Sequence, residues 1–221
     1  MAYVVDAYMT GNVVAVNTKE HNAMPNSIRE ASTYHHGDLR AALIDAAVAL
    51  IAEHGVQGLS LRECARRAGV SHAAPYRHFA EKNDLLLAIA QQGFGWLAEA
   101  GRAAMTGVTG ARERLEAYGV AYVRFAVTHP VHHRVMFSEA LGGPHTQKGD
   151  EPSFQLLVEA ATQAVGPDDP PLLAAVSAWS LPHGLAMLIL DGRIPPELVR
   201  TPDDAERLAR EVFAMWRSGL R

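Results

Sequence analysis

Side chains suited to binding DNA are concentrated in one segment, from position 59 to 86, which reads LSLRECARRAGVSHAAPYRHFAEKNDLL. Two short runs with helical spacing lie on either side of Gly69. A glycine between two short helices is typical of a helix-turn-helix. The outward faces of such helices would present donors suited to phosphates and base edges: Arg62, Arg66, His72, Tyr76, Arg77 and Lys82.

The charge of this segment differs from the charge of the chain. The whole chain has 20 basic and 24 acidic residues, a net charge of −4. Residues 56–82 reverse the sign, because they hold five basic side chains against Glu63 and Glu81. A basic region on an acidic body favours a nucleic-acid partner. For Arg66 and Arg67 the alternative is an ordinary solvated helix face.

The remaining polar residues do not form a recognisable catalytic or metal-binding pattern. His129, His132 and His133 lie close together but lack nearby cysteine or acidic partners at ligand spacing, so we expect no metal and no cofactor. We find no nucleophile elbow, phosphate-binding glycine loop or HExxH run, which argues against an enzyme. His183 and His129 are the residual acid–base candidates, and neither has a visible partner.

Helices must position these residues, because apolar residues recur at spacings of three and four almost everywhere after Leu39. We predict an all-α fold of about nine helices. Residues 1–33 lack this periodicity and are predicted to form a flexible N-terminal arm. The expected helices are Asp38–His54, 60–67, a short one from Ser71, a long one from about Lys82, 115–129, 130–141, Ser153–Val165, 171–190 and one capped by Thr201.

The segment from Tyr34 to Leu87 closely resembles the TetR/AcrR family of regulators. The resemblance rests on the helix-turn-helix followed by the run Tyr76, Phe79 and Lys82, which leads into a long helix. It implies a three-helix DNA-binding head in residues 34–82, joined by the long fourth helix to a ligand-binding and dimerisation domain in residues 83–221. The DNA contacts that it implies are Ser60, Arg62, Ser71, His72, Ala73, Tyr76, Arg77, His78 and Lys82. Alternatively, Tyr76 and Phe79 are plain core aromatics.

The same resemblance implies a ligand pocket among the fifth to eighth helices and a homodimer through the last two. The run Trp179, His183 and Gly184 is similar to the Trp-His-Gly motif of one subgroup of these C-terminal domains. Aromatic and apolar residues that suit a pocket for a small, largely apolar effector are Tyr118, Tyr122, Phe125, Met136, Phe137, Trp179, His183 and Met187. For each of them, core packing is the alternative.

Composition agrees with a globular protein in a reducing compartment. Hydrophobic residues make up 48% of the chain and charged residues 20%. The single cysteine, Cys64, excludes an internal disulfide, and no apolar run approaches the roughly 20 residues of a membrane span. We therefore expect a cytoplasmic repressor that leaves a pseudo-palindromic, double-stranded operator when its effector binds. The alternative is a divergent helical protein that binds a small molecule or partner and has lost operator binding.

Overall fold

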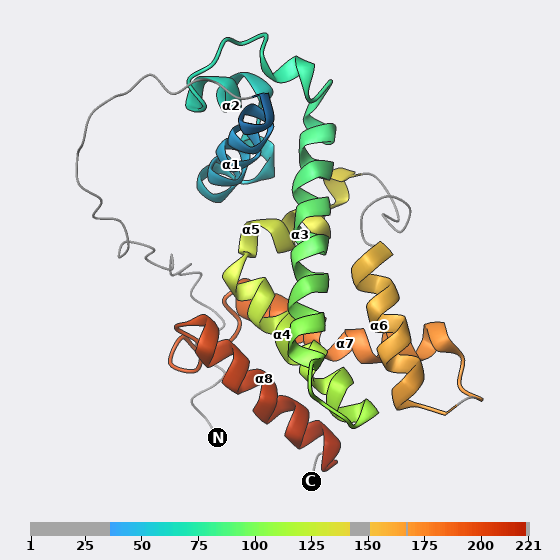
Figure 1. Cartoon of the computed structure of the whole chain (residues 1–221). Helices are drawn as coiled ribbons and strands as arrows, with labels where there is room; N and C mark the ends of the chain where they lie inside the picture. Colours follow the sequence, from blue (N-terminus) through green and yellow to red (C-terminus); the bar gives the residue numbers. More distant parts are fainter. Residues whose placement is uncertain (1–35, 142–150, 167, 220–221) are drawn as a thin grey trace. The chain divides into compact units, whose positions relative to one another are not determined.

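The computed structural model describes residues 36–141, 151–166 and 168–219, and every regular element in these ranges is helical (Figure 1). Tyr34–Arg221 form one compact unit. The predicted arm, residues 1–33, lies outside the described residues. The α-helices are α1 (His36–His54), α2 (Leu61–Arg67), α3 (Lys82–Met105), α4 (Ala111–Thr128), α5 (Pro130–Met136), α6 (Glu151–Ala164), α7 (Pro171–Leu190) and α8 (Pro202–Arg217).

Glycine stops the first two helices where the sequence predicts it. Gly55, which follows α1, has a φ of 69°, and Gly69, which follows α2, has a φ of 71°. After α2 the amide of Val70 donates to the carbonyl of Ala65 and the amide of Gly69 donates to the carbonyl of Arg66. These two bonds form a Schellman motif, which satisfies carbonyls at the helix end and turns the chain sharply.

The third helix differs from the prediction. An α-helix was expected from Ser71, but the chain forms turns and one 3₁₀ helix, Pro75–Arg77. Proline is the physical reason, because the nitrogen of Pro75 has no hydrogen to donate to the carbonyl of Ser71. The amide of Ala74 takes that carbonyl instead, at 3.0 Å, in the tighter i→i+3 pattern. The described ranges therefore hold eight α-helices rather than about nine.

Helix α3 connects the helix-turn-helix region to the other helices (Figure 1). It begins where predicted, at Lys82, with Glu81 as its N-cap and a capping box completed by Asp84. Its buried face runs from Leu85 to Met105, and it contacts α4, α5 and α6. Helix α3 also contacts α1, so one continuous helix packs against the helix-turn-helix region and against the remaining helices.

Helix α4 is central among the helices that follow the helix-turn-helix region, because it contacts α3, α6, α7 and α8. Helix α5 was expected to reach Leu141 but ends at Met136, because the amide of Ser138 bonds the carbonyl of Val135 in the i→i+3 pattern. Helix α8 begins as predicted, since Thr201 and Asp204 form a capping box and Pro202 occupies the first turn.

One described helix, α7, is long and apolar enough by length and composition to cross a membrane, with a mean hydropathy of 1.6. The sequence prediction concerned an uninterrupted apolar run, and α7 is not one, because Pro182 and His183 lie within it. Of this window, 22% is buried within the chain. Leu172, Leu173, Val176 and Leu188 are exposed large apolar side chains of α7.

Candidate functional site

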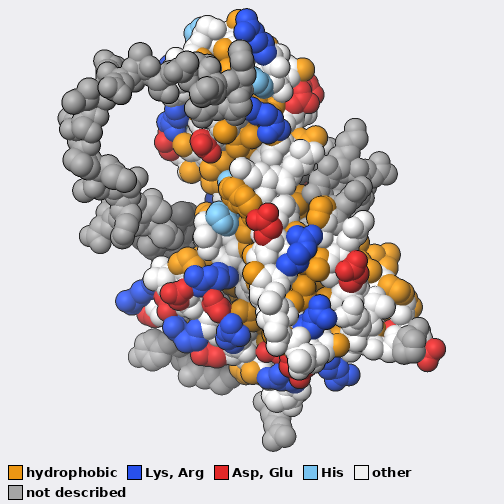
Figure 2. Space-filling view, in the orientation of Figure 1, with side chains coloured by type: hydrophobic (Ala, Val, Ile, Leu, Met, Phe, Trp, Pro, Cys, Tyr) orange, Lys and Arg blue, Asp and Glu red, His pale blue; other side chains and the backbone are white. Residues whose placement is uncertain are grey.

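The predicted DNA-contacting residues lie together on the surface around α2 and the 3₁₀ helix. Exposed members of this set are Ser60, Arg62, Ser71, His72, Ala73, Tyr76 and Arg77, while His78 and Lys82 are half-buried. In the space-filling view, Lys and Arg side chains lie at the top, where Figure 1 places α1 and α2 (Figure 2). We call this set the head surface.

Tyr76 and Phe79, which the sequence left undecided, have different environments. Phe79 is only 3% exposed and belongs to the core shared with Cys64 and Leu43, whereas Tyr76 is 52% exposed. The guanidinium of Arg40 lies 5.4 Å from the centre of the Phe79 ring, a cation–π distance that ties α1 to this segment. Phe79 is therefore a core residue, and the Tyr76 hydroxyl is available to a ligand.

Two arginines of α2 are paired with glutamates. Arg66 bonds the carboxylate of Glu63, and Arg67 bonds that of Glu53 on α1 at 2.6 and 2.8 Å. In each case the hydrogen bond to its arginine partner lowers the pKa of the glutamate. Half of a capping box forms at α2, because Ser60 accepts from the amide of Glu63 while the Glu63 carboxylate bonds Arg66. Exposed pairs of this kind add little stability.

Cys64 is fully buried between α2 and its neighbours. Burial raises the pKa of its thiol to about 11, so the thiol stays protonated at neutral pH. A protonated, inaccessible thiol reacts slowly with oxidants. Cys64 therefore packs as a small apolar side chain in the core of the head.

Four residues of the predicted pocket set come together in what we call the aromatic cluster: Tyr122, Phe137, Trp179 and His183. The cluster also includes His133, which that set lacked. The Tyr122 hydroxyl lies 3.0 Å from Nε2 of His133 and 2.7 Å from Nδ1 of His183. The Phe137 ring lies 5.6 Å from the ring of Trp179 and 4.9 Å from that of His183. This cluster joins α4, α5 and α7, and the Tyr122 hydroxyl bonds one ring nitrogen of each of its two histidines.

Burial makes the histidines of this region weak bases. It lowers the pKa of His133 to about 3 and that of His132 to about 4, and it lowers the pKa of His183 as well. The same desolvation raises the pKa of the Tyr122 hydroxyl. Buried groups are thus held neutral at pH 7. Nδ1 of His133 has no hydrogen-bond partner within the described part of the chain.

Other members of the predicted pocket set lie elsewhere. Tyr118 donates a hydrogen bond to the carbonyl of Ser153 on α6, at 3.1 Å. Met136 is fully buried, and Met187 is half-buried on α7. Phe125 lines a cavity between α3, α4 and α8 whose lining includes none of the other seven predicted residues.

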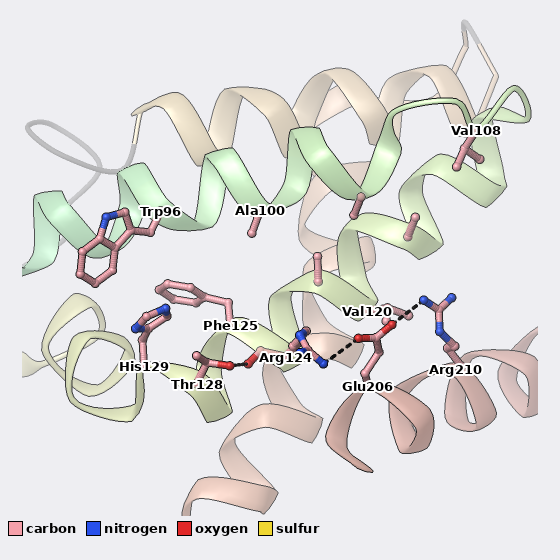
Figure 3. A pocket seen from close by; sticks show the side chains of 13 residues that line it. Trp96, Ala100, Val108, Val120, Arg124, Phe125, Thr128, His129, Glu206 and Arg210 are labelled. Carbon is pink, nitrogen blue, oxygen red and sulfur yellow. Dashed lines mark hydrogen bonds and ion pairs between the residues drawn. The ribbon is translucent and has the colours of Figure 1, made fainter. Parts of the chain in front are cut away.

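A cavity of about 560 Å³ lies between α3, α4 and α8 (Figure 3). We call it the α3–α4–α8 groove. Its lining combines alanines, an aromatic end and an ionic end: Trp96, Ala100, Ala104, Val108, Ala117, Val120, Ala121, Arg124, Phe125, Thr128, His129, Glu206 and Arg210. Of these, the sequence predictions included only Phe125. Alanines four residues apart, at 100 and 104 and again at 117 and 121, lie on one face of their helix. This spacing was the available sign of a helix face with small side chains, and the prediction considered aromatic residues instead.

Within residues 36–141, 151–166 and 168–219, the structure gathers no group of three His, Cys, Asp or Glu side chains that could hold a metal ion. The histidine-rich region is instead occupied by ring contacts. The Trp96 ring lies 4.8 Å from that of His129 and 4.7 Å from that of His132. Nε2 of His132 pairs with the side-chain oxygen of Gln92 at 3.1 Å.

Comparison with known proteins gives two adjacent family matches. Residues 43–89 match the family described as bacterial regulatory proteins, tetR family. Residues 115–216 match the family described as tetracyclin repressor-like, C-terminal domain. Together the two matches cover most of the chain. The first contains the head surface, and the second contains the part of the groove that α4 and α8 form.

Individual relatives agree with these matches. The HTH-type transcriptional regulator BetI of Rhizobium meliloti is 38% identical over 78 residues, which are 35% of this chain and 38% of BetI. The HTH-type transcriptional activator FasR of Mycolicibacterium smegmatis is 29% identical over 136 residues, which are 62% of this chain and 59% of FasR. The chain thus spans less than two thirds of these curated relatives. A Rhodococcus sp. RHA1 protein of unknown function is 33% identical, with a TM-score of 0.66, over 85% of this chain and 98% of that protein.

Proposed function

We propose, because residues 43–89 and 115–216 match two domain models of the tetR family, that this chain regulates transcription by binding a specific operator through its head surface. One observation carries the proposal. Polar and basic side chains of the helix-turn-helix segment are exposed, while its apolar side chains Leu61, Cys64 and Phe79 are buried. A surface of donors on a rigid core suits DNA recognition.

Each residue of the head surface has a proposed task. Ser71, His72 and Ala73 precede the 3₁₀ helix and would face base edges, with Ala73 limited to an apolar contact such as a thymine methyl. Tyr76 and Lys82 would bind phosphates through the hydroxyl and the ammonium group. Contacts to bases or phosphates are proposed for Arg62, Arg77 and His78, and to phosphate for Ser60 at the start of α2. The proposed domains are a head in residues 34–82 and a body in residues 83–221.

A homodimer through α7 and α8 would place two heads on one operator. Large apolar side chains are exposed on these two helices: Leu172, Leu173, Val176, Leu188, Met215 and Trp216. Water-exposed apolar surface of this extent is typical of an interface. Two-fold symmetry would then require a pseudo-palindromic operator with half-sites roughly one helical turn (~34 Å) or slightly more apart. A partner of this kind explains the apolar face of α7 without a membrane and agrees with a cytoplasmic location.

A small effector would act through α3, which begins beside the head surface and lines the groove with Trp96 and Ala100. Binding can shift the head only if the effector binds the two head positions with different affinity. The aromatic cluster and the α3–α4–α8 groove are the two places proposed for it. Trp179, His183 and Gly184 support the proposed Trp-His-Gly subgroup. We propose that operator binding represses transcription. A promoter–reporter assay tests this, and higher expression in the presence of the protein would instead make it an activator, as FasR is named.

The test is a fluorescence anisotropy titration of the full chain on labelled duplex from the DNA upstream of its own gene, at two salt concentrations. We expect saturable binding that weakens with salt and resists non-specific competitor. Tyr76→Ala and Arg62→Ala should each weaken binding by about 1–3 kcal/mol. Arg193→Ala, which removes an exposed charge between α7 and α8, should leave binding unchanged. Weak binding that is equal on every duplex would favour the alternative, a helical protein that has lost operator binding.

A further inference from the structure

We propose that the α3–α4–α8 groove binds an elongated apolar molecule that carries one carboxylate. The proposal rests on three features of the groove: walls made of alanine, an aromatic end and an end with two guanidinium groups (Figure 3). It deepens the proposed function in one respect only, by naming this molecule as the effector. Binding itself does not depend on DNA.

The shape of the groove selects an elongated body. Along α3 its wall runs from Trp96 through Ala100 to Ala104. Eight residues of helix span about 12 Å, and an extended hydrocarbon chain of roughly ten carbons has a comparable length at ordinary bond lengths. Ala117 and Ala121 on α4 form the facing wall, and all four alanines are half-buried. Side chains that end at Cβ leave room for an apolar chain between the helices.

The aromatic end suits a hydrocarbon. Rings of Phe125 and His129 lie 5.2 Å apart, and the Trp96 ring lies 4.8 Å from His129 (Figure 3). Burial lowers the pKa of His129, so its ring is neutral at pH 7. Three uncharged rings offer an apolar surface and no fixed charge.

The other end suits an anion. The Glu206 carboxylate lies between two arginines, bonded to Nη1 of Arg124 at 2.9 Å and to Nη2 of Arg210 at 2.7 Å. Each guanidinium has five N–H donors, and these bonds, with that of Arg124 Nη1 to Asp203, engage one nitrogen of each. Both arginines therefore keep N–H donors for an incoming carboxylate, while Glu206 and Asp203 balance their two charges.

The aromatic cluster is a poorer place for the same molecule. Its hydroxyl and two imidazoles already bond one another through Tyr122, and His133 is 0% exposed. A carboxylate there would meet neutral rings, because burial lowers the pKa of both His133 and His183. Desolvating an anion without a cationic partner is costly. The groove is open, and its two arginines keep N–H donors that the aromatic cluster lacks.

Isothermal titration calorimetry of the full chain with dodecanoate, below its micelle concentration, tests the proposal. Dodecanol and dodecyltrimethylammonium have the same apolar body with no charge or the opposite charge. We expect saturable binding of dodecanoate, and binding of the other two weaker by about tenfold or more. Arg210→Gln should weaken dodecanoate about tenfold. Ala121→Leu, which fills the groove with a good helix former, should abolish binding.

Arg207→Gln is the matched control, because Arg207 lies on the same helix, pairs with Asp204 and is not part of the groove. It should leave dodecanoate affinity unchanged. Absence of saturable dodecanoate binding would overturn the proposal. So would equal affinity for the three probes, or affinity that survives both Arg210→Gln and Ala121→Leu. Operator binding measured without any probe tests the proposed function separately, so either hypothesis can fail alone.

Discussion

At the scale of single side chains, the Tyr122 hydroxyl connects two helices, because it bonds His133 on α5 and His183 on α7. Tyr122→Phe leaves buried His133 with both ring nitrogens unpartnered. We expect the free energy of unfolding to fall by about 1–3 kcal/mol, the cost of an unsatisfied buried polar group. Urea denaturation measures it. Tyr76→Phe removes the same hydroxyl from an exposed ring and should change stability by less than about 0.5 kcal/mol.

The buried histidines also predict how stability depends on pH. Desolvation lowers the pKa of His132 to about 4 and that of His133 to about 3, whereas an unfolded histidine titrates near 6.5. Well above pH 6.5 both states are neutral and the effect is absent. As the pH falls below 6.5, only the unfolded chain gains these protons, so the folded state loses stability.

Between pH 7.5 and pH 5.5 we expect the free energy of unfolding to fall by roughly 2–3 kcal/mol for this pair of histidines. Urea midpoints at several pH values measure this fall. His132→Gln should remove about half of it, because glutamine does not titrate. A stability that is flat over this range in the parent chain would show that these rings gain protons in the folded state.

At the scale of helices, two of the three glycines of α3, Gly95 and Gly101, have opposite expected effects on substitution. A Cβ at Gly101 would lie 2.5 Å from two ring carbons of Tyr118, whereas at Gly95 it would meet nothing within 4 Å. Gly95→Ala should therefore raise the free energy of unfolding by about 0.5–1 kcal/mol through helix propensity. Gly101→Ala should lower it by about 1–3 kcal/mol through overpacking. Thermal melting of the two variants compares them directly, and equal effects of one sign would contradict this packing of α3 on α4.

Local signals in the sequence predicted most helix ends. Gly69 and Thr201 act within a few residues of themselves, so the end of α2 and the start of α8 were predictable. Pro75 is also a local signal, but a shifted α-helix and a 3₁₀ turn both accommodate proline, and only the surrounding contacts decide between them.

The groove could not be predicted, because its ionic end brings Arg124 beside Glu206, 82 positions away. Periodicity states which face of a helix is apolar and not which helix will cover it. The head surface was accessible to prediction for the opposite reason. Its residues lie within one continuous segment, from Ser60 to Lys82.

At the scale of the whole molecule, we expect operator binding to depend on the proposed dimer, and a substitution on α7 tests this. Leu188 is 48% exposed, and at neighbouring Gly184 an added Cβ would meet nothing within 4 Å. Leu188→Glu would bury a carboxylate in an apolar interface, which costs several kcal/mol when the charge has no partner. We therefore expect a monomer that keeps its helical content. Light scattering gives the mass, and circular dichroism gives the helical content.

Loss of the dimer should in turn weaken operator binding by about 100-fold or more, because one head then binds without the effective concentration that its partner supplies. Val165→Glu is the control, since Val165 is an exposed apolar residue that follows α6 and lies on neither α7 nor α8. It should remain dimeric and bind the operator normally. A Leu188→Glu protein that stays dimeric with full operator affinity would place the interface on another surface. A monomeric one with full affinity would show that a single head suffices.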